Sequence, residues 1–101
     1  MPPPLSNLDR ELLRRHILRY LASHHPAAFD PDMLRRAVHD RRYIDFLPSL
    51  DETNSALTIL ADLGLVTSVA PADGLPALGS SLYYRATAQG VIGTERQSET
   101  T

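Results

Sequence analysis

Residues 49–67 read SLDETNSALTILADLGLVT, and this stretch carries the signals that decide the fold. Ser49 and Glu52 stand at capping-box spacing, in which the hydroxyl and the carboxylate each accept a backbone N–H left unpaired at a helix start. Apolar residues then recur at helical spacing, at Ala56, Leu57, Leu60 and Leu63. Gly64 suits the left-handed backbone position that ends a helix, and the Leu65 side chain after it can fold back on that helix. The stretch therefore predicts a helix with a defined start and a defined end.

Two β-rich runs follow this helix. They cover residues 65–70 and 81–86, and the turn-rich segment PADGLPALGS lies between them at 71–80. Two short runs of this kind, joined by such a segment, are typical of a hairpin with a long loop. Thr87 can then cap a short final helix over about residues 88–95, although Gly90 and Gly93 weaken it.

Two further helices are predicted before residue 49. In the first, over about residues 7–23, the apolar side chains form one stripe at Leu8, Leu12, Leu13, Ile17, Tyr20 and Leu21. The second opens at Asp30-Pro31, a capping residue followed by proline at the first helical position, and runs to about Arg41. Residues 43–48 alternate in part, which is compatible with a short extended piece.

The expected fold class is α+β and mainly helical: a three-helix bundle with a C-terminal β-hairpin and a short final helix. A chain of 101 residues is long enough for one modest core. Residues 1–6 include three prolines, which predict an extended leader. We expect one domain over residues 7–96 and a disordered polar tail over residues 97–101.

Two motifs resemble sequences of the winged helix-turn-helix regulators. Residues 57–67, LTILADLGLVT, are similar to the L-x-x-L-x-x-x-G-L-V ending of the third helix in that family. Residues 84–90, YRATAQG, are similar to the Y-x-x-T-x-x-G stretch that follows the second wing strand. The two motifs lie about 20 residues apart in the family's order, and the resemblance covers roughly residues 8–96. A fainter similarity is to small winged-helix proteins of Mu-like prophages. The resemblance implies a winged-helix binding module.

In this family the third helix usually enters the DNA major groove, and the wing lies on the flanking backbone or minor groove. By position, the resemblance implies groove-facing roles for Asp51, Thr53, Asn54, Ser55 and Thr58. An asparagine can read an adenine edge through two hydrogen bonds, and hydroxyl groups can bind phosphates. The alternative is that these residues form only the solvated face of an amphipathic helix.

The charge pattern departs from that family. Residues 1–42 hold eight Arg and five acidic residues, whereas residues 43–101 hold two Arg and seven acidic residues. No Lys or Arg occurs between Tyr43 and Tyr84, which includes the whole third helix. DNA affinity rests largely on cations that neutralise phosphates. The sequence therefore leaves a second hypothesis open, a protein-interaction module that uses Asp51 and Glu52, with the apolar loop residues Leu75 and Leu78.

DNA phosphates also have candidate partners outside the third helix. The basic stretches lie on the first and second helices, and the second often crosses the DNA backbone in this motif. The preferred phosphate-binding candidates are therefore Arg35, Arg36, Arg41, Arg42 and Arg85. The alternative is again a solvated face, paired with Glu11, Asp32 and Asp40.

Most other chemistry has no support in the sequence. There is no cysteine, no metal-binding histidine motif, no nucleophile elbow and no phosphate-binding glycine loop. We therefore expect no enzyme activity, no cofactor, no metal and no small-molecule substrate. No apolar run approaches a membrane span, and the N-terminus lacks a secretory signal pattern, so a cytoplasmic protein is expected. Double-stranded DNA or a protein remains the candidate partner, with a homodimer left open.

Overall fold

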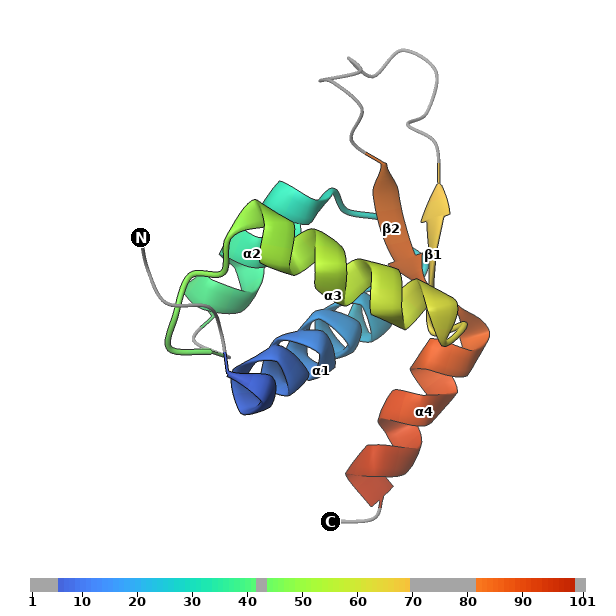
Figure 1. The fold of residues 1–101 in the computed structure, drawn as a ribbon. Helices are drawn as coiled ribbons and strands as arrows, with labels where there is room; N and C mark the ends of the chain where they lie inside the picture. Colours follow the sequence, from blue (N-terminus) through green and yellow to red (C-terminus); the bar gives the residue numbers. More distant parts are fainter. Residues whose placement is uncertain (1–5, 42–43, 70–81, 100–101) are drawn as a thin grey trace.

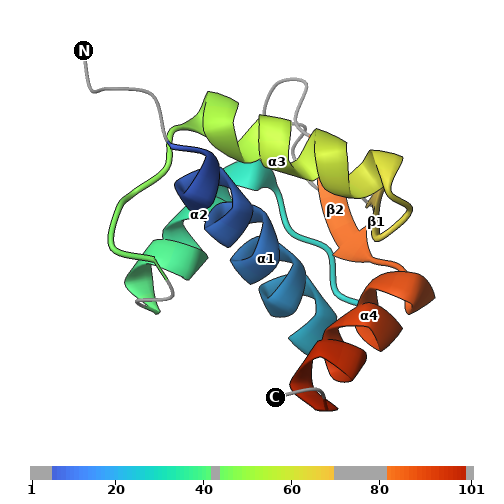
Figure 2. The ribbon, with the colours of Figure 1, turned by 60° about the horizontal axis from the view of Figure 1, so that its bottom comes forward.

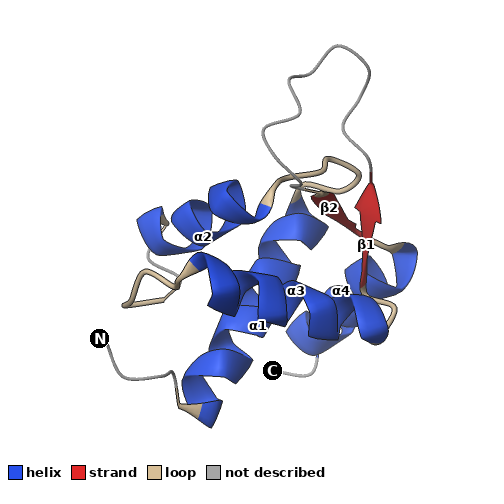
Figure 3. Ribbon diagram, turned by 45° about the horizontal axis from the view of Figure 1, so that its top comes forward, coloured by secondary structure: helices blue, strands red, loops and turns tan. Residues whose placement is uncertain are grey.

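The computed structural model describes residues 6–41, 44–69 and 82–99. It is mainly helical with one antiparallel hairpin, which confirms the predicted fold class (Figures 1 and 3). The elements in chain order are α1 (Asn7–Ser23), α2 (Pro31–Asp40), α3 (Leu50–Asp62), β1 (Val66–Val69), β2 (Tyr83–Ala86) and α4 (Ala88–Glu99).

A single apolar core lies where α1, α2 and α3 meet the hairpin. α3 lies across α1, and α4 begins at the hairpin and packs beside α1 (Figure 2). In the hairpin, Val66 pairs with Ala86, and Val69 pairs with Tyr83. The side chains buried in the core are Leu13, Ile17, Tyr20, Leu21, Leu34, Val38, Ile44, Ala56, Leu57, Leu60, Val66 and Ala86.

Side-chain caps begin the first three helices. The side chains of Ser6 and Asp30 accept the backbone N–H of Asp9 and Met33 at 3.1 and 2.8 Å. The predicted capping box of α3 is confirmed, because the Ser49 hydroxyl accepts the N–H of Glu52 at 3.1 Å. The Glu52 carboxylate in turn accepts the N–H of Ser49 at 2.9 Å. The start of α3 is therefore set by local chemistry.

Substitution of Ser49 by alanine is expected to lower the free energy of unfolding by about 1 kcal/mol, because the N–H of Glu52 loses its acceptor. Glu52→Gln is the control, since glutamine can still accept from the N–H of Ser49 and should cost less than Ser49→Ala. Urea denaturation of both variants measures the difference. Equal losses would argue against the capping box as the cause.

The end of α3 has the predicted Schellman geometry. Gly64 has φ +77°, and its N–H donates to the Ala61 carbonyl at 3.0 Å. The N–H of Leu65 donates to the Leu60 carbonyl at 3.0 Å, so the chain turns directly into β1.

Thr87 links the end of α3 to the start of α4. Its hydroxyl donates to the Gly64 carbonyl at 2.7 Å and accepts the N–H of Gly90 at 3.1 Å. The predicted cap is thus confirmed, and it also holds the hairpin closed at its base.

Some local predictions were wrong. Within the predicted 43–48 segment, Tyr43 lies outside the described residues, and residues 44–48 form no strand. Ile44 and Pro48 are buried in this connection between α2 and α3. The extended piece is Phe29 instead, which exchanges two backbone hydrogen bonds with Tyr84 at 2.9 and 2.8 Å. The strands are shorter than predicted, since Leu65 and Leu82 lie outside them.

The final helix is longer than predicted. α4 continues to Glu99, beyond the expected end near Glu95 and into the segment expected to be a tail. Gly90 does not interrupt it, because that glycine packs closely on Leu65 and Leu18.

Candidate binding surface

α3 has one buried face and one exposed face. Thr53, Ala56, Leu57 and Leu60 are buried against the bundle. Three of the predicted DNA contacts lie on the exposed face, at Asn54, Ser55 and Thr58. The Thr58 hydroxyl donates to the Asn54 carbonyl at 2.9 Å.

Thr53 was wrongly included among the groove-facing residues. Its side chain is 0% exposed, and its hydroxyl donates to the Ser49 carbonyl at 2.9 Å. Its position explains this placement, because it lies three and four residues before the buried Ala56 and Leu57 and so shares their face. A threonine can occupy a core position when its hydroxyl is satisfied by the helix itself. The helical period could have identified it.

The exposed face of α3 carries acid and no base. Asp51 and Asp62 are exposed there, Glu52 is partly exposed, and the described residues from 44 to 84 include no Arg or Lys. The apolar side chains of Ile59 and Leu63 are also exposed, at 42% and 63%. α3 by itself therefore offers hydrogen-bonding groups but no cation to a phosphate.

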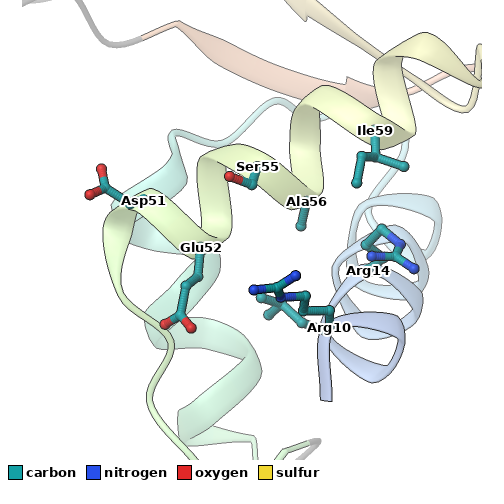
Figure 4. Close-up of a pocket in the computed structure, with 8 residues that line it drawn as sticks. Arg10, Arg14, Asp51, Glu52, Ser55, Ala56 and Ile59 are labelled. Carbon is teal, nitrogen blue, oxygen red and sulfur yellow. The ribbon is translucent and has the colours of Figure 1, made fainter. Parts of the chain in front are cut away.

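Cations from α1 lie beside α3, across a surface pocket of about 280 Å³. Arg10 and Arg14 line it from α1, and Asp51 and Glu52 line it from α3 (Figure 4). The remaining lining residues are Leu13, Ser55, Ala56 and Ile59. Within the described ranges, neither arginine forms an ion pair with these carboxylates. The guanidinium groups of Arg10 and Arg14 therefore remain available to a ligand beside α3.

Arg35 is held inside the structure. Its Nε lies 2.8 Å from a carboxylate oxygen of Asp32, and its Nη1 donates to the Pro48 carbonyl at 3.4 Å. Only 22% of its side chain is exposed. Because these contacts join α2 to the residue before the α3 cap, Arg35 positions α3. It is therefore a poor phosphate-binding candidate.

The other preferred arginines differ in their surroundings. Arg36 is exposed but shares Asp32, with its Nε 3.2 Å from the second oxygen. The guanidinium of Arg41 lies over the Tyr20 ring at 5.4 Å from its centroid. Arg85 is exposed on β2 and is paired in the ladder with Thr67. Arg42, Leu75 and Leu78 lie outside the described residues.

Three arginines of α1 are exposed, Arg10, Arg15 and Arg19, and Arg14 is partly exposed. Arg15 forms the predicted pair with Glu11, at 3.4 Å between exposed side chains. A second hollow of about 180 Å³ borders α1, the end of α3 and α4, and its charged lining residues are Arg14, Arg15, Arg19 and Glu11. Burial lowers the pKa of His16, and the charges of Arg19 and Arg15 lower it further. Arginines therefore outnumber carboxylates in this second hollow.

The described part of the chain contains neither a metal-binding cluster nor a membrane-spanning helix. No cluster of three or more histidine, aspartate or glutamate side chains there could hold a metal ion. Nor does any helix within residues 6–41, 44–69 and 82–99 have the length and apolarity needed to cross a membrane.

Solved structures share this fold over nearly the whole chain. One is a protein from Thermoplasma acidophilum that is named as a transcriptional regulator. It superposes with a TM-score of 0.70 at 15% sequence identity, and the match covers 95% of this chain and 84% of that protein. A transcriptional regulator from Clostridium thermocellum superposes with a TM-score of 0.70 at 16% identity, over 97% and 87%. No protein-family model and no curated protein matches the sequence. The similarity to proteins of Mu-like prophages therefore stays a prediction. The chain shares its fold with proteins named as transcriptional regulators.

Proposed function

We propose that the protein is a non-enzymatic regulator of transcription that binds duplex DNA through a winged-helix domain. The observation that carries this proposal is the orientation of α3. Its apolar side is held in the core, and its outward side presents Asn54, Ser55 and Thr58 to solvent. The fold likeness to two proteins named as transcriptional regulators supports the same proposal.

Each exposed polar side chain has a chemical role in such a complex. Asn54 can make two hydrogen bonds to an adenine edge in the major groove. Ser55 and Thr58 can donate to phosphate oxygens, and Arg85 on β2 can contact the backbone beside the groove. Binding by this arrangement must overcome the repulsion between phosphates and the carboxylates of Asp51 and Asp62. We therefore expect a weak, salt-sensitive complex that needs cations from elsewhere in the fold.

Fluorescence anisotropy with a labelled pool of random-sequence duplexes tests this function. We expect binding at about 50 mM salt that weakens steeply as salt rises, because cations bound to DNA are released on binding. Selection from the same pool should enrich a sequence for the wild type but not for Asn54→Ala. The matched control is Gln89→Ala, an exposed carboxamide on α4. No duplex binding at micromolar protein would overturn the proposal.

A second candidate function is a protein-interaction module. The acidic face of α3 favours it, together with the exposed side chains of Ile59 and Leu63 beside that face. The fitting partner has a basic surface with apolar residues, and α1 of a second copy offers the opposite charge. Sedimentation would support this candidate if the chain self-associates, if Asp51→Arg abolishes the association, and if duplex binding is absent.

A further inference from the structure

Four arginines on α1 form two short rows on its solvent side. Arg10 and Arg14 make one row and Arg15 and Arg19 the other, each with i,i+4 spacing. Residues four apart lie about 6 Å apart along a helix axis and on the same face. The first row borders α3 at the pocket of Figure 4, and the second row continues along the hollow beside α4. Arg14 lines both hollows, so the two rows form one continuous surface.

Most arginines of this surface form no ion pair within the described residues. Arg15 alone has an acidic partner, Glu11, at 3.4 Å, and both side chains are about half exposed. Exposed pairs of this kind contribute about 0–1 kcal/mol, so a phosphate can replace the carboxylate. Like charges at i,i+4 are slightly unfavourable in an isolated helix. A bound polyanion would relieve that repulsion.

The arginines of α2 and its C-cap residue Arg41 each contact another residue of the fold. Arg35 is engaged by Asp32 and by the Pro48 carbonyl, and Arg36 shares the same Asp32 carboxylate. Arg41 stacks over Tyr20. Electrostatic attraction therefore directs a polyanion toward α1 and away from the acidic face of α3.

We infer that α1 supplies the main phosphate contacts of this protein, with Arg10, Arg14, Arg15 and Arg19 bound to the backbone of duplex DNA. This inference rests on the proposed function and names the surface that the duplex uses. α1 contributes the cations that α3 lacks, and it does so across the pocket that the two helices share. A duplex that spans this boundary meets guanidinium groups on α1 and hydrogen-bonding side chains on α3.

The test compares two double variants that remove the same charge. Arg15→Gln with Arg19→Gln is the α1 variant, and Arg36→Gln with Arg41→Gln, which changes α2 and its C-cap residue, is the α2 variant. Each pair contains one arginine with an acidic partner and one without, and glutamine keeps a helix-forming side chain. Circular dichroism establishes that both variants are folded, and duplex anisotropy is then measured between about 50 and 200 mM salt, the range over which phosphate contacts dominate the salt response.

We expect the α1 variant to lose about two units of the salt-dependence slope, because each lost phosphate contact removes about 0.9. Its affinity at the low-salt end should fall roughly tenfold or more. The α2 variant should keep most of the salt-dependence slope and most of the low-salt affinity. The inference is overturned if the α2 variant shows the larger loss, or if wild-type protein prefers single-stranded RNA of equal length. If the wild type binds duplex DNA and the α1 variant keeps the wild-type salt-dependence slope, the inference is wrong but the proposed function stands. If the wild type does not bind duplex DNA, both are wrong.

Discussion

Alanine at position 90 is expected to destabilise the fold by about 1–3 kcal/mol, the range for overpacking a close contact. A Cβ at Gly90 would lie 2.2 Å from the Leu65 carbonyl oxygen and 3.2 Å from Cδ1 of Leu18. The Leu65 oxygen cannot move freely, because it accepts the N–H of Thr87 at 3.0 Å. The new methyl group would therefore push α4 away from the base of the hairpin. Urea denaturation measures the loss.

Gly93 provides the matched control in the same helix. A Cβ built there meets no atom within 4 Å. Gly93→Ala should therefore raise the free energy of unfolding, by up to about 1 kcal/mol, because alanine is the better helix former. The same gain in helix propensity applies at position 90, so opposite signs for the two variants isolate the contact with Leu65. A stabilising effect at both positions would contradict the tight packing of α4.

Leu57→Ala is expected to cost about 2–5 kcal/mol, which could leave a domain of this size largely unfolded at 37 °C. Leu57 is 0% exposed and lies in the core that α3 forms with α1 and α2. Truncation removes its contacts and leaves a cavity that the fold can fill only in part. Thermal unfolding and urea denaturation should both show a much earlier transition.

Leu63→Ala is the control for the same chemical change on the same segment. Leu63 is 63% exposed at the end of α3, so its truncation should change stability by less than about 1 kcal/mol. If the two variants lost similar stability, α3 would not be oriented as described. The proposed assignment of its outward face to DNA would then fail too.

Local signals accounted for most of the helical framework. Ser49 with Glu52, Asp30 with Pro31, and Gly64 each act on backbone groups within a few residues, so their effect can be predicted without knowledge of the fold. The hairpin and the cap at Thr87 were predicted in the same way. The final helix was predicted too short at its C-terminal end, because residues 97–99 were assigned to a polar tail although α4 continues to Glu99.

The candidate site was predictable only in part. The helical period alone separates Thr53, which shares the buried face, from Asn54 and Thr58, which do not. The contacts of the arginines could not be predicted from the helical period. Arg35 contacts the Pro48 carbonyl, 13 residues along the chain, and that contact exists only after α2 and α3 have packed.

The amino-acid sequence by itself determined where most helices begin and end, and that the third helix has no positive charge. Those properties depend on neighbours within one turn or on composition. Only the tertiary structure decided that α1 lies beside α3, with Arg10 and Arg14 lining a pocket together with Asp51 and Glu52, and that Phe29 pairs with β2. These residues are far apart in the chain, so core packing and backbone pairing, rather than local preference, bring them together.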